Sequence, residues 1–178
     1  MRKRIAYLIF ILSCTILPAQ EKKAGPIIND YGKVWQIENQ DYQLEKEGTF
    51  KVVFDIMNSP KDYSQRNASI ETAARFLNMH GQNGVTKSQM KVALVVHSKA
   101  SKDIIANTAY KKRYGVENPN ADMVQQLLDA GVEFIFCGQS SVSRNLPIEE
   151  TIDGVQLSLS AMTALIQLQN QGYHLIKF

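Results

Sequence analysis

Three runs of apolar residues after position 48 have the pattern of buried β-strands. They cover residues 50–56, 91–97 and 132–137 and are rich in Val, Ile and Phe. The run at 91–97 is almost continuously apolar, which indicates a strand covered on both faces of a sheet. Two shorter strands are expected over 155–159 and 174–178, so the pattern predicts a sheet of about five strands.

Segments with helical spacing separate these strands. Apolar residues recur three or four positions apart from Ile70 to Leu77 and from Met123 to Leu128, with Ser69 as the expected cap of the first helix. A last helix is expected over 162–169. Strands that alternate with helices pair in parallel through right-handed crossovers. The fold class predicted is therefore α/β, a three-layer sandwich with a mostly parallel sheet, formed by one domain over residues 49–178.

A polar, irregular segment over residues 20–48 precedes this domain and is expected to form an N-terminal arm. Within the arm, the alternation from Val34 to Ile37 predicts a short edge strand.

Residues 1–19 have the composition of an export signal. Arg2, Lys3 and Arg4 precede an apolar run from Ile5 to Leu17. As a helix this run would span about 20 Å, which is too short for the hydrocarbon core of a bilayer. We therefore expect a signal peptide over residues 1–19, cut near Ala19, and an exported, periplasmic protein.

The segment Ile11-Leu12-Ser13-Cys14 leaves an alternative open, because it resembles a lipoprotein processing box. In that case Cys14 would be lipidated and would hold the protein at a membrane.

The charge of the 178-residue chain changes meaning once the signal is set apart. The whole chain has 20 Lys and Arg residues against 17 Asp and Glu. Three of the basic residues lie in the signal, so the remainder has 17 of each sign. A nucleic-acid partner is not expected, because binding would need a cationic face on the domain itself.

Removal of the signal also leaves a single cysteine, Cys137, so no internal disulfide is expected. Cys137 ends a predicted strand and is followed by Gly138, Gln139, Ser140 and Ser141. Backbone amides in such a turn can face a sulfur anion and lower the pKa of the thiol, and the thiolate is the nucleophilic form. The alternative is that Cys137 is a small buried hydrophobic residue, as most lone cysteines are.

The carboxyl ends of parallel strands meet at one edge of a sheet, where ligands bind. The segments at this edge are 55–58, 97–98, 137–141 and 158–161. His97 is a candidate catalytic base if its strand lies beside that of Cys137, and Arg144 is a candidate substrate-binding cation. The sequence has no zinc-ligand spacing, no glycine-rich phosphate loop and no G-x-S-x-G, so neither a metal nor a cofactor is expected.

Two segments, Gly131–Ser140 and Leu168–Tyr173, carry a resemblance to the DsrE/DsrF-like family of sulfur-transfer proteins, of the TusD and YchN types. The resemblance extends from about residue 50 to residue 178. It implies a flavodoxin-like fold that assembles into homo-oligomers, either trimers or hexamers. It also implies that Cys137 carries sulfane sulfur as a persulfide, with sulfur donors and acceptor thiols or proteins as partners.

Three hypotheses of function follow. The first is an exported sulfur carrier or sulfurtransferase that acts through a persulfide on Cys137. The second is a non-catalytic binding or assembly module with the same fold. The third is a cysteine-dependent hydrolase or redox enzyme in which His97 acts as the base.

Overall fold

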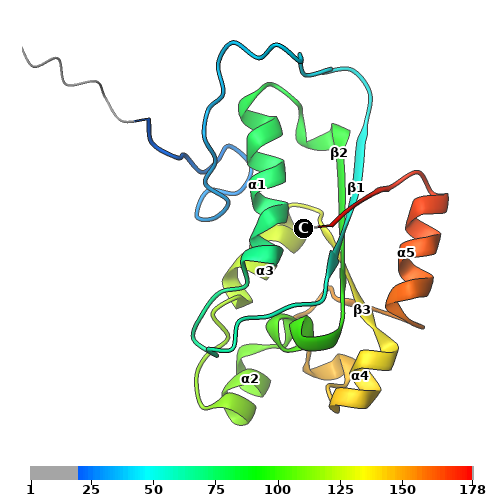
Figure 1. Cartoon of the computed structure of the whole chain (residues 1–178). Helices are drawn as coiled ribbons and strands as arrows, with labels where there is room; N and C mark the ends of the chain where they lie inside the picture. Colours follow the sequence, from blue (N-terminus) through cyan, green and yellow to red (C-terminus); the bar gives the residue numbers. More distant parts are fainter. Residues whose placement is uncertain (1–19, 178) are drawn as a thin grey trace, which may run out of the picture.

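The computed structural model describes residues 20–177, so the expected signal over 1–19, with Cys14, lies outside the described residues. The domain is built on a five-stranded, all-parallel sheet in the order β4-β3-β2-β1-β5 (Figure 1). The strands are β1 (Phe50–Ile56), β2 (Met90–Val96), β3 (Glu133–Cys137), β4 (Gln156–Ser158) and β5 (His174–Ile176). The predicted α/β fold with about five strands is confirmed.

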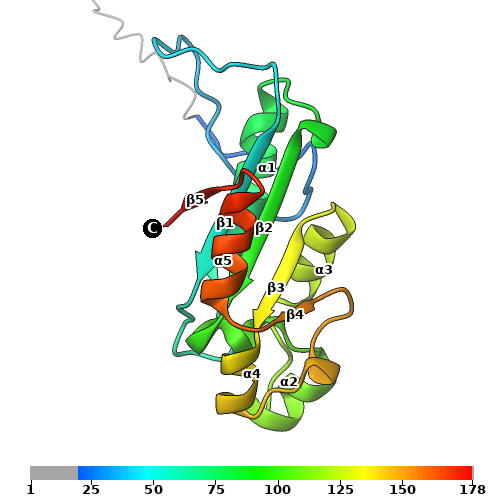
Figure 2. The ribbon, with the colours of Figure 1, turned by 90° about the vertical axis from the view of Figure 1, so that its right-hand side faces the viewer.

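Helices cover both faces of the sheet and its carboxyl edge. Helices α1 (Ala68–Gln82) and α3 (Ala121–Asp129) lie on one face, and α5 (Ala161–Asn170) lies on the other (Figures 1 and 2). Helices α2 (Asn107–Tyr114) and α4 (Gly138–Arg144) lie near the carboxyl ends of the strands. Three short 3-10 helices complete the order: η1 (Lys87–Gln89), η2 (Ser98–Ile104) and η3 (Ile148–Glu150).

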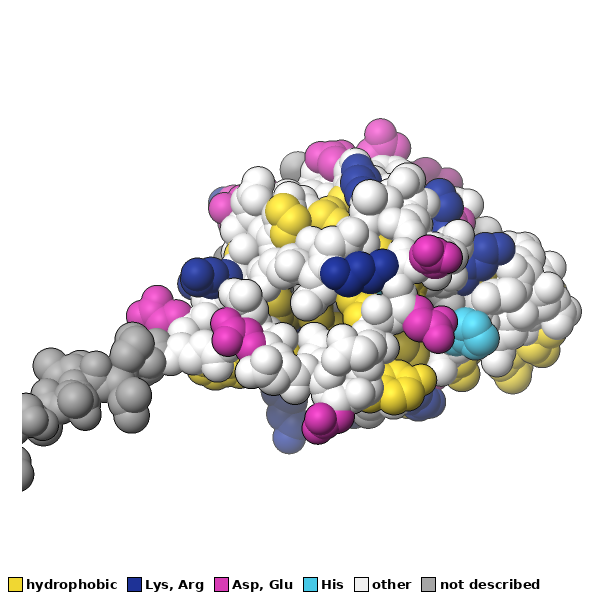
Figure 3. Space-filling view, turned by 90° about the horizontal axis from the view of Figure 1, so that it is seen from above, with side chains coloured by type: hydrophobic (Ala, Val, Ile, Leu, Met, Phe, Trp, Pro, Cys, Tyr) yellow, Lys and Arg dark blue, Asp and Glu magenta, His cyan; other side chains and the backbone are white. Residues whose placement is uncertain are grey.

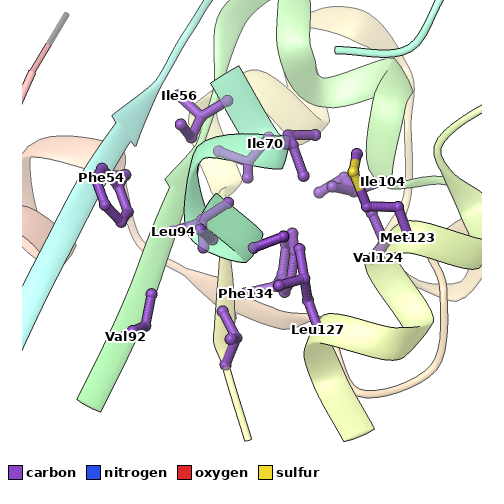
Figure 4. Packing of buried hydrophobic residues seen from close by; sticks show 14 of the residues in the cluster. Phe54, Ile56, Ile70, Val92, Leu94, Ile104, Met123, Val124, Leu127 and Phe134 are labelled. Atoms are coloured by element: carbon purple, nitrogen blue, oxygen red, sulfur yellow. The ribbon is translucent and has the colours of Figure 1, made fainter. Parts of the chain in front are cut away.

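The two faces of the sheet form cores of different size. Alternate strand residues such as Leu94 and Phe134 pack with Ile70 of α1 and Leu127 of α3 in the larger core (Figure 4). The smaller core contains Val53, Ala93 and Val95 from the sheet and Ala164 and Leu168 from α5. Since β2 is buried on both faces, its nearly continuous apolar run has a direct structural cause.

Two local expectations from the sequence are wrong, and one helix was not expected. No strand forms from Val34 to Ile37, where a single antiparallel bridge joins Val34 to Lys23. Helix α2 was not expected; Tyr110 is its only buried residue, with Ala109 and Tyr114 partly buried against the core, so it has no extended apolar stripe to detect. The cap of α1 is Asn67, whose side chain accepts a hydrogen bond from Ser69 N at 2.9 Å.

The N-terminal arm packs on α1 through one buried polar side chain. Asn78, fully buried in α1, accepts from Ile28 N at 2.9 Å and donates to the carbonyls of Ile28 and Tyr31 at 2.8 and 2.9 Å. Gly32 has a φ of +68°, and a Cβ there would lie 2.4 Å from the Ala74 carbonyl carbon. Hydrogen bonds and close backbone contact therefore hold the arm on the larger-core side of the domain.

The amino edge of the sheet has a mixed surface. Viewed from that end, positive and negative side chains are interspersed, with small hydrophobic areas between them (Figure 3). Among the described residues, no helix combines the length and apolarity needed to span a bilayer.

Candidate functional site

Cys137 is the last residue of β3 and stands directly before α4, so its side chain lies at the carboxyl edge of the sheet. Its neighbour in the register is Ser158 of β4. The residue is 4% exposed and packs with Val95 and Ala161 in the smaller core, on the face covered by α5. It is the only free cysteine in residues 20–177. The thiol thus lies next to the first residue of α5 and directly before the first residue of α4.

The surroundings of the sulfur favour its anion. Burial raises the pKa of the Cys137 thiol, but the backbone N–H groups of Ser140 and Ala161, the Ser140 side chain and the Gln139 N–H together lower it. The net result is a pKa below the ordinary value for cysteine. Because these donors come from the amino ends of both α4 and α5, two segments far apart in the sequence stabilise one thiolate.

Gly138 allows these two segments to approach each other. A Cβ at this position would lie 2.6 Å from the carbonyl oxygen of Ser158 and 3.2 Å from that of Leu159. Any side chain would therefore push the chain between β4 and α5 away from the thiol. The glycine is required here for close packing of backbone on backbone.

Ser140 connects the thiol to the end of β2. Its Oγ accepts a hydrogen bond from Ser98 N at 2.9 Å, and its side chain also hydrogen-bonds to Cys137. Ser98 has a φ of +54°, a left-handed conformation that a serine rarely adopts. The turn after β2 is therefore held in an unusual geometry that places its amide on Ser140.

The imidazole of His97 makes its hydrogen bond to β1 and not to the thiol. The pairs Val95–Ile135 and Val96–Phe136 place His97 beside Cys137 along neighbouring strands. Its Nε2 nevertheless donates to Asp55 Oδ1 on β1, at 2.7 Å. No hydrogen bond joins His97 to Cys137 among the described residues, so amides rather than an imidazole set the state of the thiol.

Asp55 is the centre of a small ion-pair network. Its Oδ2 accepts from Lys177 Nζ at 2.8 Å, while Oδ1 accepts from His97. Burial raises the pKa of Asp55, but the hydrogen bonds from Lys177 and His97 lower it by more than burial raises it. The net pKa therefore lies below the ordinary value. The network joins β1, the end of β2 and the C-terminal segment.

This network predicts a specific pH dependence of stability. A carboxyl whose pKa is lowered by folding contributes stability above its unfolded pKa, about 4, and loses it as the pH falls through the folded value. Asp55→Asn should therefore lower the free energy of unfolding by about 1.5 kcal/mol near pH 7 and by progressively less below about pH 4. Urea unfolding between these pH values measures the difference. The exposed Asp41→Asn is the matched control, and an acid slope identical in parent and Asp55→Asn would contradict the assignment.

The remaining predicted site residues fall into two groups. Gln139 is exposed near the thiol and donates to the Leu159 carbonyl at 3.4 Å. Ser141 is buried and donates to the Leu146 carbonyl at 2.8 Å, so it closes the end of α4. Arg144 is the last residue of this helix, about 10 Å further along its axis from Cys137. The structure thus brings Gly138, Gln139 and Ser140 to the thiol and places Arg144 elsewhere.

Two contributors to this region were not assigned roles from the sequence. Ala161 and Asp55 both lie in segments that the pattern places at the carboxyl edge of the sheet. Nothing in the sequence shows that the Ala161 amide faces the sulfur or that Asp55 pairs with His97. The strand order decides both contacts, because it places β4 beside β3 and β1 beside β2.

Several apolar side chains on the elements that flank Cys137 are exposed. We call this set the thiol-side patch; its members are Val142 on α4, Leu159 after β4, and Met162 and Ile166 on α5. Leu157 of β4 is also exposed, but it pairs in register with Phe136 and lies on the face of the larger core. Val142, Leu159 and Met162 are 83%, 72% and 73% exposed. The three elements lie together on the side of the molecule that faces the viewer in Figure 2. Large exposed apolar groups at one place are typical of an interaction surface.

The fold and the site together define a class: a parallel α/β domain with one cysteine at the end of a central strand, between the amino ends of two helices. A sequence profile of the DsrE/DsrF-like family matches residues 51–178. The chain therefore belongs to the DsrE/DsrF-like family, which is known for sulfur relay. No curated protein matches the sequence.

Solved structures agree on the fold. One is a protein of unknown function, MTH1491 from Methanobacterium thermoautotrophicum, with 16% identity and a TM-score of 0.56, over 72% of this chain and 99% of that one. Another is the ychN protein from E. coli, with 17% identity and a TM-score of 0.55, over 73% of this chain and all of that one. At these identities the likeness shows a shared architecture.

Proposed function

We propose that this chain is an exported sulfur carrier that holds sulfane sulfur as a persulfide on Cys137. The observation that carries the proposal is the set of hydrogen-bond donors at the sulfur: the N–H groups of Gln139, Ser140 and Ala161 and the Ser140 side chain. They lower the thiol pKa despite burial and increase the fraction of reactive thiolate. Membership of a family known for sulfur relay supports the same function.

The transfer takes place in two balanced steps. The Cys137 thiolate attacks the terminal sulfur of a donor persulfide, R–S–SH, forms a new S–S bond and releases R–S⁻ as the leaving group. An acceptor thiolate then attacks the outer sulfur of Cys137–S–SH, takes it as a new persulfide and regenerates the Cys137 thiolate. No net oxidant or reductant is needed. The amides that stabilise the starting thiolate also stabilise the thiolate that leaves in the second step.

The burial of the thiol favours small donors. A residue that is 4% exposed presents little of its sulfur to the surface of another folded protein. Polysulfide and thiosulfate are small sulfane compounds, and with thiosulfate the leaving group is sulfite.

Mass spectrometry of the intact protein tests the proposal. Incubation of the full chain with polysulfide should add about 32 Da per sulfur atom, and a reducing thiol should remove the added mass. Peptide mapping should locate the adduct on the peptide that contains Cys137. A protein that gains no mass with any sulfane donor would contradict the function.

We also propose export, on the basis of the cationic and apolar composition of residues 1–19. Cell fractionation and N-terminal sequencing test it, with a mature N-terminus near Gln20 as the expected result. A lipid-modified Cys14 would identify the lipoprotein alternative, and a full-length cytoplasmic protein would contradict both.

A second candidate function, assembly through a homo-oligomer, is favoured by the thiol-side patch. Strand β4 is an edge strand of the sheet, so its unpaired backbone lies beside the exposed Leu157 and Leu159. A second copy of the chain that covered this surface would bury the patch and enclose the thiol region.

Leu159→Glu should therefore convert the oligomer, expected to be a trimer or hexamer, to monomers. The reason is that a buried charge without a partner is strongly unfavourable in an apolar interface. Light scattering coupled to gel filtration measures the mass. Tyr42→Glu, at a 95% exposed position in the arm, is the control and should leave the mass unchanged. A monomeric parent protein would rule out assembly through this patch.

A further inference from the structure

A second candidate site lies at the carboxyl edge of the sheet, on the far side of α4 from the thiol. It is a cavity of about 590 Å³ between the loop after β1, η2, the end of α2 and the end of α4. These elements lie together at the lower end of the molecule in Figures 1 and 2. We call it the Arg144 cavity. Its position and size are those of a ligand site in an open parallel sheet.

The charge of the Arg144 cavity has a single sign. Four cationic residues line it, and none of the described lining residues is acidic: the cations are Lys61, Lys99, Lys102 and Arg144. Lys61, Lys99 and Arg144 make no ion pair among the described residues. Residues 20–178 have as many acidic as basic residues in total, so this concentration of unpaired cations is a local feature that attracts anions.

Lys102 is fixed within the wall of the cavity. It is buried, and its Nζ donates to Asp103 Oδ1 at 2.7 Å and to Tyr110 Oη at 3.4 Å. Asp103 is fully buried and also accepts from Ser59 Oγ at 3.0 Å and from Asn67 Nδ2 at 2.7 Å. The ammonium also lies 5.5 Å from the ring centroid of Tyr63, another residue that lines the cavity. A lysine held in this way donates without first losing side-chain freedom.

An aromatic wall stands beside the cations. The rings of Tyr63 and Tyr114, both lining residues, stack with centroids 4.4 Å apart and planes inclined by 22°. Burial raises the pKa of Tyr114, so its hydroxyl stays protonated and remains a donor. The cavity therefore combines cationic donors with a flat apolar surface that suits an aromatic group.

We infer that the Arg144 cavity binds a tetrahedral dianion through Lys99, Lys102 and Arg144. The ligand is either a free oxyanion or the anionic group of a small aromatic molecule that lies against Tyr63. Phosphate, sulfate and thiosulfate groups share this shape and charge, and the guanidinium of Arg144 can bind two of their oxygens at once. The inference is independent of persulfide chemistry, because no residue of the cavity is among the hydrogen-bond donors at Cys137.

Calorimetric titration of the full chain at low ionic strength tests the inference with sodium phosphate, sodium sulfate and phenyl phosphate, none of which carries sulfane sulfur. Saturable binding at one site per chain is expected for phosphate and sulfate. Phenyl phosphate that binds about tenfold more tightly than phosphate would assign an aromatic ligand, because the ring adds stacking on tyrosine. Equal affinity would assign a free oxyanion.

Matched variants separate the site from general attraction of anions. Arg144→Gln and Lys99→Gln should each weaken binding about tenfold or more, since each removes a charged donor. Lys112→Gln, on the exposed surface of α2 outside the cavity, should change it less than about twofold. Lys102 is left in place, because Asp103 would otherwise be buried without its cation.

Two results would overturn the inference: no saturable binding of any of the three probes, or an equal loss of binding in Lys112→Gln and Arg144→Gln. Cys137→Ser should bind the probes as the parent does. If Cys137 takes up no sulfur, the inference about the Arg144 cavity is unaffected. If the cavity binds no anion, the proposal of a sulfur carrier is unaffected.

Discussion

Cys137→Ser is expected to abolish sulfur loading completely. Serine replaces sulfur by oxygen in a side chain of nearly the same shape, so the packing against Val95 and Ala161 is kept. The hydroxyl stays protonated at neutral pH and forms no persulfide, whereas the thiol of Cys137 has a lowered pKa and is nucleophilic as its thiolate. The intact mass after treatment with polysulfide measures the effect, with no sulfur adduct as the expected result.

The control for this prediction is Cys14→Ser, which replaces the other cysteine in the sequence. In a chain that retains residues 1–19, Cys14→Ser should keep the full sulfur adduct on Cys137. Circular dichroism and urea unfolding of Cys137→Ser should match the parent within about 1 kcal/mol, because the side chain is small and its volume is nearly conserved. A persulfide that persists in Cys137→Ser would remove this residue from the function.

Gly138→Ala is expected to reduce both stability and thiol reactivity. The added Cβ meets the Ser158 carbonyl oxygen at 2.6 Å, so the chain between β4 and α5 must shift. Such crowding costs about 1–3 kcal/mol in the free energy of unfolding. The same shift moves the Ala161 amide away from the sulfur, so the thiol pKa should rise toward its ordinary value. Urea unfolding and the pH dependence of alkylation by iodoacetamide measure the two effects.

The neighbouring Gln139→Ala is the matched control for Gly138→Ala. It shortens an exposed side chain whose hydrogen bond to the Leu159 carbonyl is long, at 3.4 Å. Its stability should stay within about 0.5 kcal/mol of the parent, and its alkylation profile should hardly move, because the Gln139 backbone amide remains. A Gly138→Ala protein with parental stability and an unchanged alkylation profile would show that close approach of the two backbones is unimportant.

The thiol and the Arg144 cavity lie at the two ends of α4, a helix of seven residues. One end supplies amides to the sulfur, and the other supplies a guanidinium to a cationic cavity. Both ends lie at the carboxyl edge of a parallel sheet, where loops of different origin converge. The connection between β3 and β4 therefore contributes to two chemically different surfaces.

The pairing of His97 shows that the position of a residue along a strand does not determine its hydrogen-bond partner. The sequence places His97 and Cys137 at the ends of successive strands, and the structure confirms that these strands are neighbours. The side chain of His97 nevertheless bonds to Asp55 on the opposite neighbour, β1. A carboxylate is a stronger acceptor for an imidazole N–H than a thiol, and it is held in place there by Lys177.

The sequence by itself determined the architecture and the position of Cys137 in it. The pattern of apolar residues is a local property of the chain, and burial on both faces leaves a nearly continuous apolar run in a strand such as β2. The end of a strand is equally local, so the position of Cys137 at the sheet edge could be read from the residues around it. Helix α2 was not predicted, because only one of its side chains, Tyr110, is buried and the sequence therefore has no helical period of apolar residues there.

Only the tertiary structure decided what surrounds the thiol. The amide of Ala161 lies 24 positions from Cys137 along the chain, and it reaches the sulfur because β4 pairs with β3 and Gly138 lets the backbones meet. The same folding separates Arg144 from the thiol and gathers it with Lys99 and Lys102 from another loop. Electrostatic effects depend on distances between atoms in space. A linear sequence states which groups exist, and the strand order determines which of them meet.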